Sequence, residues 1–231
     1  MVTGDFIPRS DIPPYSWWQR WVIDRFHELY YGRWRKGLQD TTALSWFGYH
    51  TLKCPLDLWM YQELLVRTRP DLVIETGTRF GGSALYLASI CDLLGAGRVV
   101  TIDIEDPSNG RLPVHPRVSY LRGSSVEPSI VQQVREIAGP QPNALVVLDS
   151  DHGRDHVLAE LRAYRDFVPV GGYLIVEDTN VNGHPASRRF GPGPWEAVDA
   201  FLAETDAFVP DRSCERFMMT LNPRGYLRRV K

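Results

Sequence analysis

The 231-residue sequence is poor in cysteine: Cys54, Cys91 and Cys214 are widely spaced and form no CxxC pair. An odd number of isolated cysteines argues against a disulfide framework or a zinc site and favours a reducing cytoplasm. No apolar run approaches the roughly 20 residues that cross a bilayer, and residues 1–10 lack the pattern of a secretory signal. We therefore expect no membrane partner.

A surplus of positive charge is absent as well. The formal net charge is -2, whereas binding to nucleic-acid phosphates needs an excess of Lys and Arg, so we expect no nucleic acid as a partner. The composition, 43% hydrophobic and 23% charged, is that of a globular protein able to bury a sizeable core. We expect residues 1–45 to form an N-terminal arm and helix, and residues 46–231 to form the main domain.

Aromatic residues are concentrated near the N-terminus, where five of the seven tryptophans precede the first obvious strand: Trp17, Trp18, Trp21, Trp34 and Trp46. Three prolines in residues 1–14 predict an irregular arm. From Ser16 to about Gly32 the apolar residues follow helical spacing. Such a helix could pack on the domain or on a second subunit, which would make the protein a homo-oligomer, or it could form a lid over a pocket.

Short apolar runs then alternate with helical patterns. Strands are predicted at 72–74, 98–104, 118–121, 144–148 and 173–176, and helices at 56–68, from about 82, at 126–138, 157–168 and 195–202. Such alternation builds a parallel sheet with right-handed crossovers. Residues 216–221 and 225–230 flank Asn222-Pro223-Arg224, which predicts a final hairpin. The fold class is therefore α/β and Rossmann-like: a mostly parallel seven-stranded sheet that ends in an antiparallel hairpin, as is usual in methyltransferases of class I.

A glycine-rich loop follows the first of these strands, with the sequence Glu75-Thr76-Gly77-Thr78-Arg79-Phe80-Gly81-Gly82-Ser83. Glycines allow a tight strand-to-helix turn and a close approach of ligand to backbone. The loop lacks the GxGxxG spacing of nicotinamide-dependent oxidoreductases and the Lys-Ser/Thr ending of a P-loop. Glu75 at the strand tip would repel a pyrophosphate but not a sulfonium amino acid, which favours S-adenosylmethionine. We expect Glu75, Gly77, Thr78, Gly81 and Ser83 to contact this cofactor.

Two further segments extend the predicted nucleoside site. Asp103 ends the second strand, where a carboxylate can accept hydrogen bonds from both ribose hydroxyls. Ser124 and Ser125 follow the third strand, and their small polar side chains could contact the edge of an adenine ring. We also assign Asp149, at the end of the fourth strand, to the cofactor side.

Acidic residues gather where the fourth and fifth strands end. Asp151 follows the fourth strand, and Glu177 and Asp178 follow the fifth. The carboxyl ends of neighbouring parallel strands open into one crevice, and three converging carboxylates would repel one another unless a cation were present. All-oxygen ligands favour Mg²⁺ or another hard divalent cation, which would ease loss of the proton from an acceptor hydroxyl. Alternatively, these acids hold helix N-termini or bind the amino group of the cofactor.

Histidines supply the candidate bases. His152 is the best placed, because it follows Asp151 directly and imidazole titrates near neutrality. We therefore predict His152 and Asp151 as the catalytic residues. His156 is equally consistent with packing. His184 could face the acceptor from the Asn182-Gly183-His184-Pro185 loop.

Together these motifs resemble the cephalosporin hydroxylase family, which includes the cephamycin methoxylation methyltransferase and rhamnosyl O-methyltransferases. The resemblance runs from about residue 44 to the C-terminus. It rests on Trp46, Gly48, Lys53, Pro55, Asp57, Glu75-Thr76-Gly77, Gly81-Gly82-Ser83, Thr101-Ile102-Asp103, Asp149-Ser150-Asp151-His152, Glu177-Asp178, Gly191-Pro192-Gly193-Pro194-Trp195 and Gly225-Tyr226-Leu227-Arg228-Arg229.

The resemblance implies methylation, dependent on S-adenosylmethionine and Mg²⁺, of a small hydroxylated acceptor: a sugar, a glycoside or another specialised, antibiotic-type metabolite. It places the metal ligands on Asp151, Glu177 and Asp178. Relatives that carry a proposed base histidine have it two or three residues after the metal aspartate, where this chain has Gly153 and Arg154.

Lys53 and one loop segment are further candidates for the binding site. Lys53 could pair with the carboxylate of the cofactor, or it could be a solvated lysine at a helix start. The Gly- and Pro-rich segment 180–195 is predicted to recognise the acceptor and to act as a lid.

Two rival functions keep the same cofactor site. One is a methyltransferase that needs no metal and uses the acids for structure. The other is a non-catalytic protein that binds the cofactor and assists a partner oxygenase.

Overall fold

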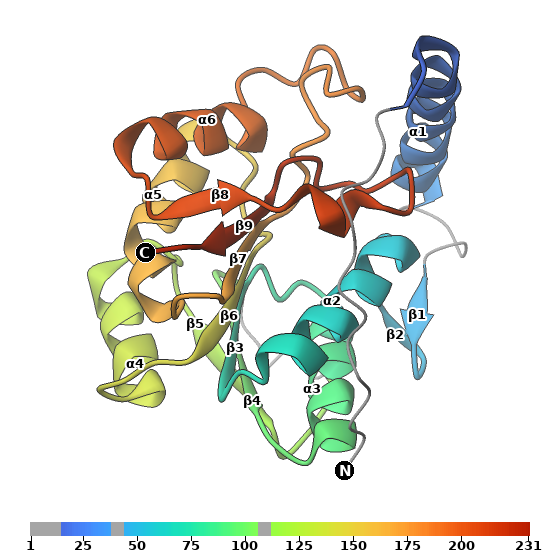
Figure 1. Ribbon diagram of the computed structural model, residues 1–231. Coiled ribbons are helices and arrows are strands. Elements are labelled where there is room, and N and C mark those ends of the chain that lie inside the picture. Colours follow the sequence, from blue (N-terminus) through green and yellow to red (C-terminus); the bar gives the residue numbers. More distant parts are fainter. Residues whose placement is uncertain (1–14, 38–43, 106–111) are drawn as a thin grey trace.

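The computed structural model describes residues 15–37, 44–105 and 112–231, so the predicted arm at 1–14 lies outside the described part. Its main feature is a seven-stranded sheet in the order β5-β4-β3-β6-β7-β9-β8 (Figure 1). The strands are β3 (Leu72–Thr76), β4 (Arg98–Asp103), β5 (Val118–Arg122), β6 (Ala144–Leu148), β7 (Tyr173–Val176), β8 (Phe208–Pro210) and β9 (Tyr226–Arg229). Strands β3 to β7 run parallel, and β9 is antiparallel to both β7 and β8. The predicted fold class is confirmed.

Helices cover both faces of the sheet. They are α1 (Trp17–Gly37), α2 (Pro55–Thr68), α3 (Gly82–Leu94), α4 (Pro128–Ala138), α5 (Arg154–Tyr164) and α6 (Pro194–Glu204), with short 3₁₀ turns at Arg165–Phe167 and Arg212–Glu215. Helices α2 and α3 share one apolar cluster with one face of the sheet, and α4, α5 and α6 share another with the opposite face (Figure 1). This double burial explains the continuous apolar runs of β3 and β6. Within the described part of the chain, no helix is both long and apolar enough to span a membrane.

The strand order places a ligand crevice at the centre of the sheet. Strands β4 and β5 lie to one side of β3, while β6 and β7 lie to the other, so the order reverses between β3 and β6. Loops that leave the carboxyl ends of these two strands diverge, and ligands of open α/β sheets bind between them. The glycine loop follows β3 and Asp149 follows β6, so both predicted motifs lie at this switch point.

The final hairpin differs from the prediction. Strand β9 lies within the predicted 225–230 segment, but its hairpin partner is β8, and residues 216–221 form no strand. Polar groups of this segment bind the carboxylate of Asp57 instead. It accepts hydrogen bonds from the hydroxyl of Thr220 and from the backbone N–H of Leu221, the latter at 2.9 Å. Because Asp57 comes from α2, the sequence around residues 216–221 could not show that these hydrogen bonds replace strand pairing.

Two short strands, β1 (Ser45–Trp46) and β2 (Tyr49–His50), pair antiparallel ahead of α2 and were not predicted.

Helix α1 carries both exposed and buried side chains. Trp17, Trp18 and Trp21 are largely exposed, with Trp17 at 82%. His27 and Tyr31 are buried, and His27 Nε2 lies 2.8 Å from Asn180 Nδ2 in the segment after β7. This part of α1 is therefore packed on the domain, as one of the alternatives predicted.

The buried Asp57 carboxylate should contribute strongly to stability. It also accepts a hydrogen bond of 2.8 Å from the Tyr226 hydroxyl. Asp57→Ala would leave three buried donors without a partner, so we expect the free energy of unfolding to fall by about 2–4 kcal/mol. Urea denaturation measures this. Asp71→Ala, at an exposed position, is the matched control, and an equal loss in both variants would contradict the role of Asp57.

Candidate active site

The turn after β3 requires glycine at Gly77. Its φ is +88°, a conformation that other residues rarely adopt, and a Cβ atom there would collide with the backbone carbonyl of Asp149. The loops after β3 and β6 are thus in direct backbone contact. The N–H of Asp149 donates to the carbonyl of Thr76 at 3.1 Å, which continues the pairing of the two strands.

A pocket of about 730 Å³ opens at this edge of the sheet, within the size range of small-molecule sites. The predicted residues that line it are Lys53, Gly77, Thr78, Ser83, Asp103, Ser124, Ser125, Asp149, Asp151, His152 and Asp178. Glu75, Gly81 and Glu177 are absent from the lining. One cavity therefore joins most of the predicted cofactor contacts to the acids after β6 and β7.

At one end of the pocket Asp103 is held in a fixed orientation. Its Oδ2 accepts from the N–H of Arg79 at 2.8 Å, and its Oδ1 accepts from the N–H of Glu105 at 2.9 Å. Each carboxylate oxygen has a second lone pair, so Asp103 can still accept hydrogen bonds from a ribose. Ser124 follows Gly123, whose N–H donates to the carbonyl of Asp103 at 2.8 Å.

Glu75 lies beneath the pocket rather than in its wall. It is fully buried, and its Oε2 accepts a hydrogen bond of 2.7 Å from Thr101. Burial raises the pKa of Glu75, and the charge of Lys53 offsets this only in part. Glu75 therefore shapes the floor of the site, whereas the prediction placed it in contact with the cofactor.

Lys53 has its charge matched by two protein carboxylates. Its ammonium is buried and pairs with Asp149 and, at 2.7 Å, with Glu177. Burial lowers the pKa of Lys53, but the two carboxylates outweigh this and the net shift is upward. Burial raises the pKa of both Asp149 and Glu177 despite the ammonium. Lys53 is thus neither solvated nor free to bind a cofactor carboxylate without giving up a partner.

The acids that face one another across the pocket are Asp149 and Asp178. One atom each of Asp149, His152 and Asp178 lie within 4.8 Å of one another. His152 Nε2 is 3.3 Å from Asp178 Oδ2 and 3.9 Å from Asp149 Oδ1. Asp178 has a φ of +52°, and its backbone N–H donates to Asn222 Oδ1 at 3.1 Å, so its strained backbone is held in place.

The predicted trio is divided by the structure. Asp178 lies in the cluster, but Asp151 is exposed at the pocket rim, and its Oδ1 accepts from the N–H of Gly153 at 2.6 Å. Glu177 points to Lys53 and Tyr61, whose hydroxyl donates to Glu177 Oε1 at 2.7 Å. The turn at Gly153 holds the Asp151 carboxylate, and the ion pair with Lys53 holds that of Glu177. The side chains that cluster with Asp178 are therefore those of Asp149 and His152.

The histidines occupy different surroundings. Burial lowers the pKa of His152, but Asp178 and Asp149 outweigh this and raise it overall, which favours a positive charge between the two acids. His184 does not line the pocket. It stacks on Trp195 with ring centroids 4.2 Å apart and contacts Glu196 at 3.1 Å, so it has a packing role.

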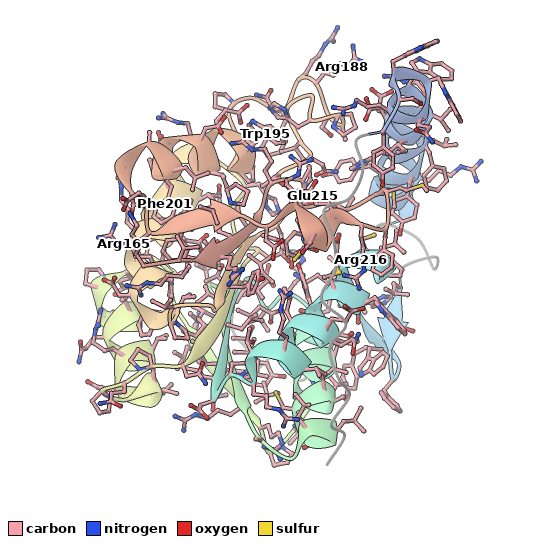
Figure 2. All side chains as sticks on the ribbon, viewed as in Figure 1. Arg165, Arg188, Trp195, Phe201, Glu215 and Arg216 are labelled. Atoms are coloured by element: carbon pink, nitrogen blue, oxygen red, sulfur yellow. The ribbon has the colours of Figure 1, made fainter. Side chains whose placement is uncertain are left out.

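Several wall residues were not predicted individually. Aromatic side chains form part of the pocket lining: Tyr31, His50, Phe80 and Phe190. Tyr31 comes from α1, for which a lid was one alternative, and Phe190 comes from the segment predicted to recognise the acceptor. Arg188, at the tip of that segment, extends toward α1 and approaches Glu28 at 3.4 Å (Figure 2). Helix α1 and this segment thus meet beside the pocket.

Residues 39–230 match the family model described as Rhamnosyl O-methyltransferase/CmcI. The chain belongs to this family. Rhamnosyl O-methyltransferase from Mycobacterium tuberculosis (strain ATCC 25618 / H37Rv) is 38% identical over 213 residues, which cover 89% of this chain and 84% of the relative. The enzyme of the same name from Mycobacterium leprae (strain TN) is 38% identical over 185 residues, covering 79% of each chain.

Solved structures share the fold at lower sequence identity. A CmcI structure with Mg and SAM superposes with a TM-score of 0.62 at 22% identity and covers 81% of this chain and 77% of its own. The O-methyltransferase TomG from Streptomyces achromogenes, involved in tomaymycin synthesis and solved with SAM, gives 0.53 at 17% identity, covering 80% and 79%. This chain therefore shares the fold of these structures.

The buried ion pairs predict a pH-dependent effect of Lys53→Met. Removing the ammonium leaves two buried carboxylates unpaired, so we expect a loss of about 3–5 kcal/mol in the free energy of unfolding near neutral pH. Asp149 and Glu177 already have raised pKa values, and the substitution raises them further. The folded wild-type protein loses these two protons near pH 6 to 7, whereas the variant keeps them to higher pH. A folded state that binds more protons than the unfolded state loses stability as pH rises, so the loss relative to the wild type should grow above about pH 6.

Urea denaturation at pH 5 and pH 8 measures this difference. Lys231→Met, which breaks an exposed pair with Asp206, is the control and should leave stability nearly unchanged at either pH. A loss in Lys53→Met that is the same at both pH values would contradict the arrangement of charges described above.

Proposed function

We propose that this protein transfers the methyl group of S-adenosylmethionine to a hydroxyl of a sugar or a related metabolite, with a hard divalent cation such as Mg²⁺. The observation that carries the proposal is that one pocket holds Asp103 at one end and the facing carboxylates of Asp149 and Asp178 at the other. A nucleoside and a cation-bound hydroxyl could therefore meet in a single cavity. Membership of the family supports the same reaction.

The residues present fit the methyl donor. Gly77 lines the pocket, and Asp103 keeps lone pairs for the ribose hydroxyls. Lys53 and Asp149 line the same pocket. The enzyme would hold the donor so that its sulfonium methyl faces the acceptor oxygen, and this alignment would supply much of the rate acceleration.

The acids also fit a divalent cation. Asp149 and Asp178 offer carboxylate oxygens, the ligands that Mg²⁺ prefers, and His152 Nε2 lies within the same cluster. We propose Asp149 and Asp178 as the principal ligands. The set expected from sequence, Asp151 with Glu177 and Asp178, would require Asp151 to leave its turn and Glu177 to leave Lys53. A cation bound there would lower the pKa of an acceptor hydroxyl.

The acceptor is proposed to be a sugar hydroxyl because the relatives that cover most of this chain are rhamnosyl O-methyltransferases. The aromatic rings of Tyr31 and Phe190 could pack against the apolar face of a sugar ring, leaving the sugar hydroxyls directed at the acids. His152 lies between Asp149 and Asp178. A cation bound to the two acids would favour the neutral form of His152, which is then placed to take the hydroxyl proton.

The reaction itself is the first test. Purified protein with S-adenosylmethionine, Mg²⁺ and a rhamnose-bearing glycoside should yield S-adenosylhomocysteine and a methyl ether, followed by mass spectrometry. Thorough chelation should lower the rate at least about 100-fold, and Mg²⁺ should restore it. Methyl transfer unaffected by chelation would support the metal-independent rival. Cofactor binding without transfer to any hydroxylated acceptor would support an accessory role.

Substitutions separate the two ligand sets. Asp149→Asn and Asp178→Asn should each lower kcat about 100-fold or more, because each removes a charge from the reacting centre. Asp151→Asn, at the rim, should change kcat by less than about threefold. Calorimetric titration with S-adenosylhomocysteine checks that the Asp178→Asn protein still binds the nucleoside. A large loss for Asp151→Asn with little loss for Asp149→Asn would favour the set expected from sequence.

A further inference from the structure

A buried carboxylate outside the residues discussed above organises one end of the pocket. Glu160, on α5, is fully buried and does not line the pocket. Its Oε1 accepts hydrogen bonds from two serine hydroxyls, that of Ser125 at 2.5 Å and that of Ser150 at 2.7 Å. Ser125 follows β5 and Ser150 follows β6, so a single oxygen atom ties together the two loops.

These contacts fix the direction of each hydrogen bond. A carboxylate oxygen has only lone pairs to offer, so both serine hydroxyls must direct their single proton to Glu160. His156 Nε2 lies 3.2 Å from each serine oxygen and 3.6 Å from Glu160 Oε1. Because the serine protons are already committed, the oxygens accept from His156 and its Nε2 carries hydrogen. What the two serines have left for a ligand is lone pairs alone.

The position of this group in the pocket indicates which ligand atom it meets. Ser125, Ser150 and His156 all line the cavity. Ser125 lies two residues after Gly123, whose N–H is bonded to the carbonyl of Asp103. With a ribose on Asp103, the base attached to it would extend toward the loops after β5 and β6.

We infer that Ser125 and Ser150, polarised by Glu160, form an acceptor-only wall that selects a base with an exocyclic amino group and rejects a base with a carbonyl oxygen at that position. The inference rests on the proposed function, in which the ligand is an adenosyl compound. The amino group of adenine donates to the serine oxygens. The 6-oxo group of hypoxanthine would place lone pairs against lone pairs, and a buried acceptor left unpaired costs affinity. Glu160 is a positioning residue, because it acts through the serines.

The test compares two nucleosides that differ only in this group. Calorimetric titration of the full chain with S-adenosylhomocysteine and with S-inosylhomocysteine should show at least about tenfold tighter binding of the adenosyl compound. In Glu160→Gln the amide N–H₂ can donate to one serine oxygen, which frees that hydroxyl to donate to a carbonyl. We expect the ratio of the two dissociation constants to fall to within about threefold.

A control variant and two serine variants accompany this test. Asp155→Asn removes an exposed acid from the same helix and should leave the ratio at the wild-type value. Ser125→Ala and Ser150→Ala should weaken binding of the adenosyl compound and should not weaken binding of the inosyl compound. Thermal unfolding of each variant identifies any that does not fold, and the wild-type ratio tests the inference without variants.

The outcomes distinguish the inference from the proposed function. Equal binding of the two nucleosides by the wild-type protein, or an unchanged ratio in a folded Glu160→Gln protein, overturns the inference and leaves the methyltransferase proposal standing. If neither nucleoside binds, the proposed function fails and the inference fails with it.

Discussion

The site depends on the need to match charges that are removed from water. Lys53 is buried between Asp149 and Glu177, which come from the ends of β6 and β7. Because an unpaired buried charge costs several kcal/mol, these three side chains hold one another in place. This arrangement turns Glu177 away from the pocket and fixes the position of Asp149. Asp178, the next residue, is left to face the cavity.

The backbone conformation at two positions also shapes the site. Gly77 permits the loop after β3 to contact the carbonyl of Asp149, and the left-handed conformation of Asp178 directs its side chain toward His152. Each position lies at the carboxyl end of a parallel strand, where the chain must leave the sheet. The same edge of the sheet thus provides both an opening for a nucleoside and a pair of facing carboxylates.

Helix α1 links the N-terminal region to this edge. His27 contacts Asn180, and Glu28 lies beside Arg188 of the segment after β7. Tyr31 then reaches the pocket that Phe190 also lines. The part of the cavity assigned to the acceptor is therefore built by two segments far apart in the chain. The carboxylates at the strand ends and the aromatic side chains of the proposed acceptor space thus come from separate parts of the molecule.

The sequence by itself determined the parallel strands, because β3, β6 and β7 are buried on both faces and need continuous apolar runs. It also located the glycine turn and Asp103, since both lie directly at a strand end. Tertiary structure alone decided which acids face the cavity: the turn at Gly153 holds Asp151, and Lys53 holds Glu177. It likewise decided the partner of β9, because Asp57 of α2 binds the segment predicted to be a strand. Side-chain direction beyond a strand end depends on contacts with distant segments, and local periodicity carries no record of them.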